Sequence, residues 1–394
     1  MLEDKLKVYV TSYSEEVTGS NNHLKVEWPD GRTVSFLVDC GLFQEKDHNH
    51  INAEKLPYKA DNISFVIATH VHTDHVGRLP YLALNGFKGS IYCSYETSQL
   101  LSTVLVESAE RLEDEFRLDL KKYKDKKDKV RKLKTSSKGR GRKDKPRHDK
   151  CVKKRKKTEE RLRPPVLIYG KEDIERVMKN VSPKNIYETF EPCEGIEVTF
   201  YPNAHIAGAV LTVCKVYDDE EEIHILFTGD LGITNPVTSG ETNIPKEVAE
   251  KIDIIVSEST YGSAEAVRNV ERERQKHMDI ISEVHKKKGT IMYMSNALER
   301  PLRLGADLRD MQNDSPIQNQ MQDFEIYFDS TFGIKCLNKY VKLYGKDFLP
   351  DKFTVIDKIC RQQAIDVAGP KMIICTSPRL FQGSFLNYGA RMLE

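Results

Sequence analysis

The sequence predicts a layered α/β protein with a mixed β-sheet, and two observations lead to that prediction. Short runs of β-branched and aromatic residues recur along the chain, with hairpin-like spacing early and strand–helix alternation later. Closely spaced strands pair antiparallel, whereas strands joined through a helix pair in parallel. A chain of 394 residues is also long enough for two domains and for a core that needs no covalent staples.

Each expected strand is a short apolar run that ends at a turn. In chain order the runs are VSFLVDCG (34–41), ISFVIATH (63–70), GSIYCS (89–94), IEVTFYPNAH (196–205), AVLTVCKVY (209–217), IHILFTGD (223–230), IDIIVSEST (252–260), TIMYMSN (290–296), EIYFDS (325–330) and KMIICTS (371–377). Helices are expected over Ser98 to Phe116, Lys171 to Lys179 and Val267 to Lys287. In the last helix, Ile280, Ile281 and Val284 are expected on one face.

Composition excludes several classes of protein. The eight cysteines form no Cys-x-x-Cys pair, which argues against a cysteine zinc knuckle or a disulfide framework. The first residues, MLEDKLKVYV, lack the apolar core of a signal peptide, and no apolar run reaches the roughly 18 residues of a membrane span. We therefore expect a cytoplasmic protein that does not enter the membrane.

A net charge of +1 hides a strongly basic segment, Lys121 to Arg163. It holds 23 Lys and Arg against 6 Asp and Glu, a charge of +17, and it has almost no apolar residues. Such a composition cannot bury a core, so we expect a disordered insertion. It is either a solvated insertion alone or a flexible arm that neutralises nucleic-acid phosphates, and we favour the arm.

Metal-capable side chains follow several of the expected strands. The stretch FVIATHVHTDHVGRLP places three histidines and an aspartate within six residues, His70 to His75. Asp39, His205 and Asp230 each end another apolar run. A lone histidine at a strand end is most often structural, but four strand ends with His or Asp predict a site. Imidazole and carboxylate ligands suit zinc, manganese or iron.

The HVHTDH stretch, His70 to His75, resembles the signature of the metallo-β-lactamase superfamily, and Asp39, His205 and Asp230 stand at that superfamily's other motifs. The closer likeness is to its β-CASP branch, which includes ribonuclease J and the cleavage-and-polyadenylation endonuclease. Matching stretches are EVTGSNNHLKV, VDCGLFQ, SESTYG, SNALERP, YFDSTFGIK and ICTSPRLFQGSF. SNALERP has Glu299 where the branch usually has glycine.

The resemblance implies an αββα metallo-β-lactamase sandwich into which a β-CASP α/β domain is inserted. It places the first domain at residues 1–262, with the basic insertion 121–163 inside it, and an incomplete β-CASP domain at 263–394. Two closing histidines of the branch have no match, because only His277 and His285 follow Asp230, and we interpret both as surface residues of a helix. We therefore expect a truncated, split or degenerate member, weakly active alone, that pairs with itself or with a complementing chain.

The resemblance also assigns the site. Two divalent ions, zinc by preference, would be held by His70, His72 and His205 on one side and by Asp74 and His75 on the other, with Asp230 bridging. Asp74, Asp230 and Glu258 would be catalytic, with Glu258 near the path of the proton, and Asp39 would orient a ligand histidine. A loop or helix-capping acid is the alternative interpretation of Glu258.

Three functions fit these observations. The first, which we favour, is a metal-dependent phosphodiester hydrolase that acts on RNA, bound through the metal site and the basic segment. The second is a hydrolase of small esters or thioesters on the same fold. The third is a scaffold without catalysis that binds RNA or a partner. The intact set of six ligands argues against the scaffold, and the β-CASP-like stretches argue against the esterase.

Overall fold

A computed structural model describes residues 5–14, 17–44, 50–138, 164–260, 262, 270–356 and 361–376 of the chain. Residues 139–163 of the basic segment lie outside the described residues. So does the end of the ICTSPRLFQGSF stretch after Thr376.

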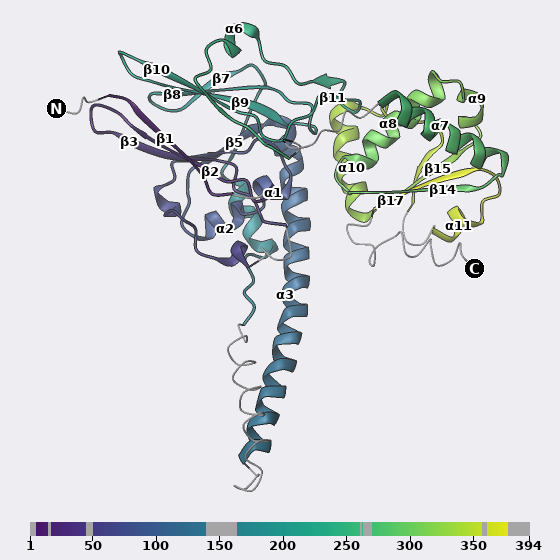
Figure 1. Ribbon diagram of the computed structural model, residues 1–394, viewed down its shortest axis with the longest axis horizontal. Helices are drawn as coiled ribbons and strands as arrows, with labels where there is room; N and C mark the ends of the chain where they lie inside the picture. The colour runs from purple at the N-terminus through teal and green to yellow at the C-terminus, as the bar shows by residue number, and fades with distance from the viewer. Residues whose placement is uncertain are drawn as a thin grey trace.

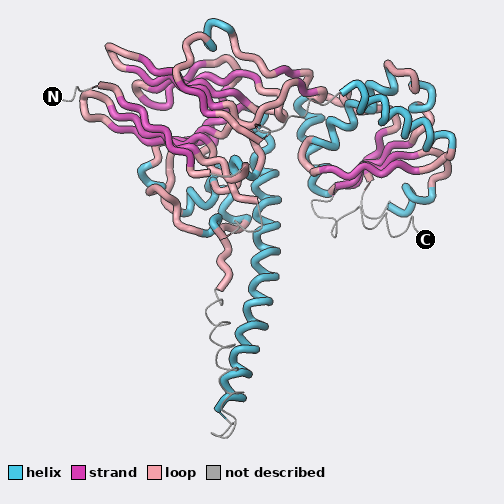
Figure 2. The backbone as a smooth tube through the Cα atoms, viewed as in Figure 1, coloured by secondary structure: helices cyan, strands magenta, loops and turns pink. Residues whose placement is uncertain are grey.

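Two β-sheets stacked face to face form the first half of the fold (Figures 1 and 2). The first sheet has the strand order β1 (Lys7–Ser12), β2 (Asn22–Glu27), β3 (Thr33–Val38), β4 (Phe65–Ile67), β5 (Ser90–Ser94) and β6 (Val181–Lys184). The second has the order β13 (Ile254–Val256), β10 (Glu222–Phe227), β9 (Val210–Tyr217), β8 (Ile196–Pro202) and β7 (Thr189–Cys193). Antiparallel hairpins open the first sheet and parallel strands continue it from β3 to β6, which confirms the predicted mixed sheet.

Alternation along the strands builds two cores on opposite faces of the first sheet. Phe36 and Val38 of β3 pack against the second sheet, while Leu37 between them faces the helices. The same alternation holds for β4, because successive side chains of a strand point to opposite faces. The apolar core between the two sheets therefore fixes how their strand ends lie relative to each other.

Short helices cover the outer face of the first sheet. They are η1 (Ile51–Ala53), η2 (Ala60–Asn62), α1 (Thr73–Val76), α2 (Leu79–Leu84), η4 (Lys171–Asp173) and α5 (Ile174–Met178). Next to the second sheet lie the small hairpin of β11 (Thr234–Asn235) and β12 (Gly240–Glu241) and the helix α6 (Lys246–Ala249).

The helix α3 (Tyr95–Lys138) starts in this core and then runs far out of the body (Figure 1). Its 44 residues make a rod about 66 Å long at 1.5 Å per residue. Its first turns are buried in the core through Leu100, Leu101, Val104 and Leu105. The prediction that the basic segment is disordered is wrong for its first part, because Lys121 to Lys138 continue the helix. Lysine and arginine favour helix, so a segment too polar to pack can still extend one that is already nucleated.

A parallel four-stranded sheet forms the second half of the fold, with the order β14 (Thr290–Ser295), β17 (Lys371–Thr376), β15 (Glu325–Asp329) and β16 (Phe353–Val355). The helices beside it are α7 (Val270–Lys286), α8 (Arg300–Asn313), α9 (Gln318–Met321), α10 (Thr331–Tyr344) and α11 (Arg361–Asp366). Every residue of β17 is buried, as expected for an inner strand covered on both faces. Helix α10 packs on α3, and Lys335 Nζ lies 3.9 Å from Glu107 Oε2 across that contact.

Two predictions about α7 need correction. Ile281 is buried and Val284 partly so, but Ile280 is 53% exposed, because neighbouring residues of a helix point about 100° apart. His277 and His285 were interpreted as surface residues, and neither is fully exposed. Both are partly buried, with His277 Nε2 2.7 Å from Tyr293 Oη and His285 Nε2 2.8 Å from an oxygen of Asp323.

Candidate metal centre

The HVHTDH turn lies where the end of β4 meets the short helix α1. His70 follows the strand and His72 is the N-cap of the helix. Hydrogen bonds from the neighbouring loops hold its backbone: Leu42 N–H donates to Thr73 O at 2.9 Å and Cys40 N–H donates to His75 O at 2.7 Å. Backbone hydrogen bonds of the protein alone therefore fix the geometry of the turn.

Close packing explains the glycine in the loop after β3. A Cβ built on Gly41 would lie 1.6 Å from the carbonyl oxygen of Asp74. The same carbonyl accepts a hydrogen bond from Ser20 N–H at 2.8 Å, and Gly41 N–H donates to Ser20 O at 2.8 Å. Only a glycine lets the two backbones approach this closely.

The structure brings all six predicted ligands together in two overlapping groups. The first comprises His70, His72, His205 and Asp230, and the second comprises Asp74, His75 and Asp230. Within each group the potential ligand atoms lie within 4.8 Å of one another. Asp230 joins the groups, because Oδ1 lies 3.1 Å from His75 Nε2 while Oδ2 lies 3.4 Å from His205 Nε2.

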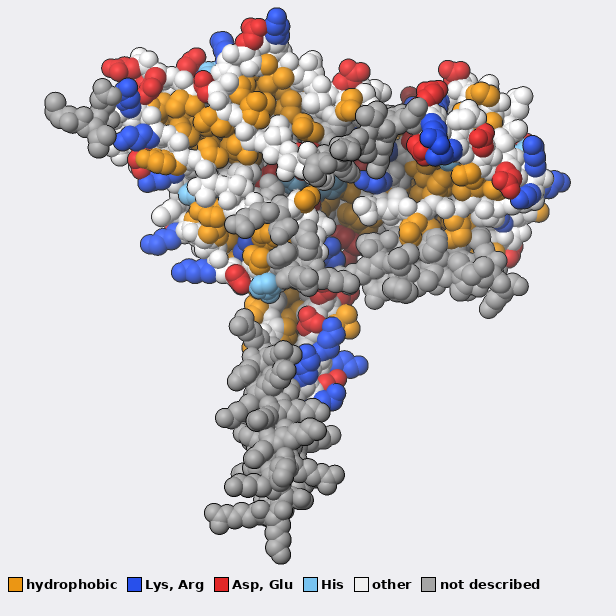
Figure 3. Space-filling view, viewed as in Figure 1, with side chains coloured by type: hydrophobic (Ala, Val, Ile, Leu, Met, Phe, Trp, Pro, Cys, Tyr) orange, Lys and Arg blue, Asp and Glu red, His pale blue; other side chains and the backbone are white. Residues whose placement is uncertain are grey.

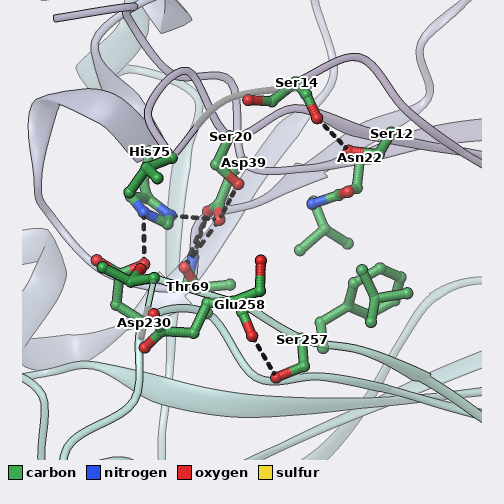
Figure 4. A pocket seen from close by; sticks show the side chains of 17 residues that line it. Ser12, Ser14, Ser20, Asn22, Asp39, Thr69, His75, Asp230, Ser257 and Glu258 are labelled. Carbon is green, nitrogen blue, oxygen red and sulfur yellow. Dashed lines mark hydrogen bonds and ion pairs between the residues drawn. The ribbon is translucent and has the colours of Figure 1, made fainter. Parts of the chain in front are cut away.

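Asp39 lies behind these residues and orients His75, the role that the resemblance implied (Figure 4). Its carboxylate is 2% exposed and accepts Thr69 N–H at 2.9 Å, the Thr69 hydroxyl, and His75 Nδ1 at 2.7 Å. Ser20 Oγ donates to the same carboxylate at 3.2 Å. Asp39 itself has φ of 65°, in the left-handed region that aspartate tolerates better than most residues.

These contacts set the tautomers of two histidines. Because His75 Nδ1–H donates to Asp39, Nε2 is the nitrogen that faces the centre, 3.1 Å from Asp230 Oδ1. Because the Thr69 hydroxyl donates to Asp39, it accepts from His70 Nδ1–H at 3.1 Å and leaves Nε2 of that ring free to coordinate. Both rings therefore turn Nε2 toward Asp230, which the two groups share.

The three histidines of the first group are held neutral. Burial lowers the pKa of His70 well below its ordinary value, and His75 adds to that effect. Burial and the neighbouring His205 lower the pKa of His72 to about 3. Burial also lowers the pKa of His205. Neutral imidazole is the form that binds a metal ion, so these rings are ready to coordinate at neutral pH.

The second group is differently charged. Burial opposes protonation of His75, but Asp39 and Asp230 outweigh it and hold its pKa well above the ordinary value. Burial alone would raise the pKa of Asp230, but its hydrogen bond with His75 outweighs this and lowers it. Burial raises the pKa of Asp74. A metal ion bound here would displace the proton of His75 Nε2 and lie between the carboxyl groups of Asp74 and Asp230.

Two residues that sequence reasoning missed join the loops of the site. Asn203, 6% exposed, donates through Nδ2 to Thr228 O and Asp230 O at 2.9 and 2.7 Å, while its Oδ1 accepts His205 N–H at 3.0 Å. Gln44 Nε2 donates to Asp74 Oδ1 at 3.1 Å. Asn203 stands two residues before His205 at the end of an expected strand, so the sequence predicted its position near the site. It could not predict the hydrogen-bond partners of Asn203, which are distant in sequence.

A cavity of about 380 Å³ opens beside the second group (Figure 4). Its wall includes Asp39, His75, Asp230 and Glu258, together with several hydroxyls, namely Ser12, Ser14, Ser20, Thr69, Ser257, Ser259 and Thr260. Glu258 follows β13, and its Oε1 accepts Leu231 N–H at 2.6 Å, next to Asp230. The structure therefore places this acid at the site, and its catalytic role stays a prediction.

The family follows from a match that covers more than half of the chain. Residues 26–275 match the family described as "Metallo-beta-lactamase superfamily". The chain belongs to this superfamily. The αββα arrangement of two stacked sheets with a metal-capable centre at their strand ends is the fold that the resemblance predicted.

Relatives confirm the predicted β-CASP branch. A ribonuclease of Thermus thermophilus is 22% identical over 390 residues, covering 95% of this chain and 73% of its own length. The cleavage and polyadenylation specificity factor subunit 3-II of Arabidopsis thaliana is 28% identical over 323 residues, covering 80% of this chain and 42% of its own length. Integrator complex subunit 11 of Danio rerio is 25% identical over 262 residues, covering 64% of this chain and 33% of its own length. The chain thus spans less than half of two of these relatives.

The donor set fits a divalent metal ion. It consists of imidazole nitrogens and carboxylate oxygens without a thiolate, which suits zinc and other transition metals at catalytic sites. Carboxylate–histidine pairs of the Asp39–His75 kind are the usual second layer around such ions. No helix among the described residues combines the length and apolarity that a bilayer crossing needs.

Proposed function

We propose that the chain is a metal-dependent ribonuclease that hydrolyses phosphodiester bonds of RNA at a site for two zinc ions. The observation that carries the proposal is the sharing of Asp230 between two groups of ligands, each within 4.8 Å, beside an open cavity. His70, His72 and His205 would hold one ion, Asp74 and His75 the other, and Asp230 both. When bound, two such ions would activate water and stabilise negative charge on the phosphoryl oxygens.

The chain's own residues hold this arrangement in place. Asp39 keeps His75 in the tautomer whose Nε2 can coordinate, and Thr69 does the same for His70. Asn203 ties the loop of His205 to the loop of Asp230. Glu258, in the cavity wall beside Asp230, is the carboxyl group that we assign to proton transfer near the substrate.

The projecting helix supplies a second contact for RNA. Along its outer part, Lys121 to Arg131, seven Lys and Arg are exposed against two Asp, and basic side chains line the described shaft in Figure 3. Cationic side chains on a rigid helix bind phosphates without reading sequence and lose affinity as salt rises. This helix is the described part of the basic segment that we assign to RNA binding.

Metal analysis and RNA cleavage by the purified chain test the proposal. We expect bound zinc, cleavage of a single-stranded RNA, and loss of both in the double variant His72→Ala, Asp230→Ala. The matched control removes another His–Asp pair, His285→Ala with Asp323→Ala, which lies on α7 and the loop after α9, in the second half of the fold. If the site variant keeps its zinc, or cleaves RNA as the control does, the proposal is wrong.

A further inference from the structure

A buried carboxylate of the second half of the fold lies against the metal-site loop. Glu299 is the N-cap residue of α8 and is 3% exposed. It occupies the position in SNALERP where glycine was expected. A buried carboxylate is costly unless each oxygen is well hydrogen-bonded, so its partners indicate what it does.

Four donors converge on Glu299, two on each oxygen. Oε2 accepts Ala207 N–H at 2.6 Å and the Tyr340 hydroxyl of α10. Oε1 accepts Asn235 Nδ2 at 2.7 Å and Arg303 Nε at 3.0 Å. Ala207 and Asn235 belong to the metallo-β-lactamase part, whereas Tyr340 and Arg303 belong to the four-stranded α/β part. The carboxylate therefore joins the two halves of the fold.

The same pair of residues brackets one metal ligand. Arg303, paired with Glu299, donates through Nη2 to Ala204 O at 2.6 Å and to Thr234 O at 3.2 Å. Glu299 accepts the N–H of Ala207. Between these two anchors lies His205, whose Nε2 is 3.1 Å from His72 Nδ1. The backbone on both sides of His205 is thus held by a side-chain pair from α8.

We infer that Glu299 is a positioning residue for His205, and that it makes the metal affinity of the site depend on docking of the α/β part. The inference rests on the proposed metal centre and adds a determinant outside the ligands and their immediate partners. The carboxylate is required for this role because all four of its partners donate. Glutamine has one oxygen and one NH₂ group, so whichever way it turns, an N–H faces two donors.

Two measurements on the full chain test the inference, with Glu299→Gln as the variant. The control is Asp310→Asn, which removes a carboxylate of the same helix that pairs with its neighbour Arg309. The first measurement is amide hydrogen exchange of residues 203–211 in metal-free protein. The second is zinc affinity by competition with a chromogenic chelator. We expect faster exchange at Ala207 and zinc binding weaker by about 10-fold or more in Glu299→Gln, as for other changes behind a metal ligand, and neither effect in the control.

Each outcome decides the matter. Unchanged exchange at Ala207 overturns the inference, and so does faster exchange with unchanged zinc affinity. Faster exchange spread evenly over the chain means a general loss of stability and also overturns it. If the unaltered chain binds no zinc, the proposed function fails, while exchange at Ala207 still decides whether Glu299 anchors the loop. Should Glu299→Gln not fold, Arg303→Lys is the second variant, expected to act in the same direction by releasing Ala204 O.

Discussion

Replacing Asp39 by asparagine should disable one half of the metal centre while leaving the fold intact. The carboxylate makes three strong contacts, of which Thr69 N–H on Oδ1 and His75 Nδ1 on Oδ2 are decisive. Asparagine keeps the shape but has a single acceptor oxygen. If that oxygen stays with Thr69, the NH₂ group faces His75 Nδ1, which must then accept, and the proton moves to His75 Nε2.

The magnitude follows from that change of tautomer. A protonated Nε2 has no lone pair for a metal ion, so the group of Asp74, His75 and Asp230 loses one of its three ligands. Changes of this kind typically weaken metal binding about 10- to 100-fold, or roughly 1.4–2.7 kcal/mol at 1.36 kcal/mol per tenfold step. The group of His70, His72 and His205 should change little, because Thr69 keeps its acceptor.

Zinc titration in competition with a chelator of known affinity measures both sites in one experiment. We expect two zinc ions per chain before the change and one tightly bound ion after it. The matched control is Ser20→Ala, which removes the weaker 3.2 Å contact to the same carboxylate without altering any tautomer. Equal weakening of both sites, or titration curves that coincide for Asp39→Asn and the unaltered chain, would refute the reasoning.

Four further predictions test other parts of the structure. Gly41→Ala should displace the turn that carries the ligands, because its Cβ would lie 1.6 Å from Asp74 O, and zinc binding should fall by about 10-fold or more; a chelator titration measures this. Phe36→Ala should lower the free energy of unfolding, measured by urea denaturation, by about 3–5 kcal/mol. The side chain is fully buried and stacks on Phe65, with the ring centroids 4.5 Å apart. Changing Lys126, Lys127 and Lys129 to Glu should weaken RNA binding at low salt and flatten the dependence of log K on log salt. Lys246→Glu, at an exposed position on α6, is the control. Filter binding at several salt concentrations measures the slope of log K against log salt, and equal slopes for the triple variant and the control would contradict the prediction. Stripping the metal with a chelator and dialysis should lower Tm, and adding zinc back should restore it, because an ion that binds only the folded state stabilises it; scanning calorimetry with the His72→Ala, Asp230→Ala variant as control checks this.

Local patterns in the sequence were enough to predict the strands and to bring attention to the ligands. A short apolar run such as ISFVIATH indicates a buried strand, and the side chain at its end, His70, lies at the edge of the sheet where other strands also end. The ends of strands are the part of a layered fold that a sequence reveals best, because the hydrophobic period and the length of an apolar run can both be read from neighbouring residues. The relative placement of His205 and Asp230 was inferred from the resemblance rather than from spacing.

Contacts between distant segments were not predictable in the same way. The buried carboxylate of Glu299 meets donors from four parts of the chain, and Asn203 bonds to a loop 27 residues away. Neither residue type signals such partners, since Glu and Asn are mostly exposed. The prediction of disorder over Lys121 to Lys138 failed for a different reason. Composition indicates that a segment cannot bury a core, but it does not indicate whether the segment continues a neighbouring helix.

The site draws its ligands from both sheets, and this links its geometry to the core between them. His70 follows β4 of the first sheet, whereas His205 and Asp230 follow β8 and β10 of the second. Close to the ligands the two sheets are joined directly, since Val210 N–H donates to Thr69 O at 3.0 Å. A shift of one sheet over the other would therefore separate the ligand groups that share Asp230. Since interiors are close-packed and shift little without cost, the apolar layer of Phe36, Phe65 and their neighbours holds the proposed metal ligands in register as much as the hydrogen bonds around them do.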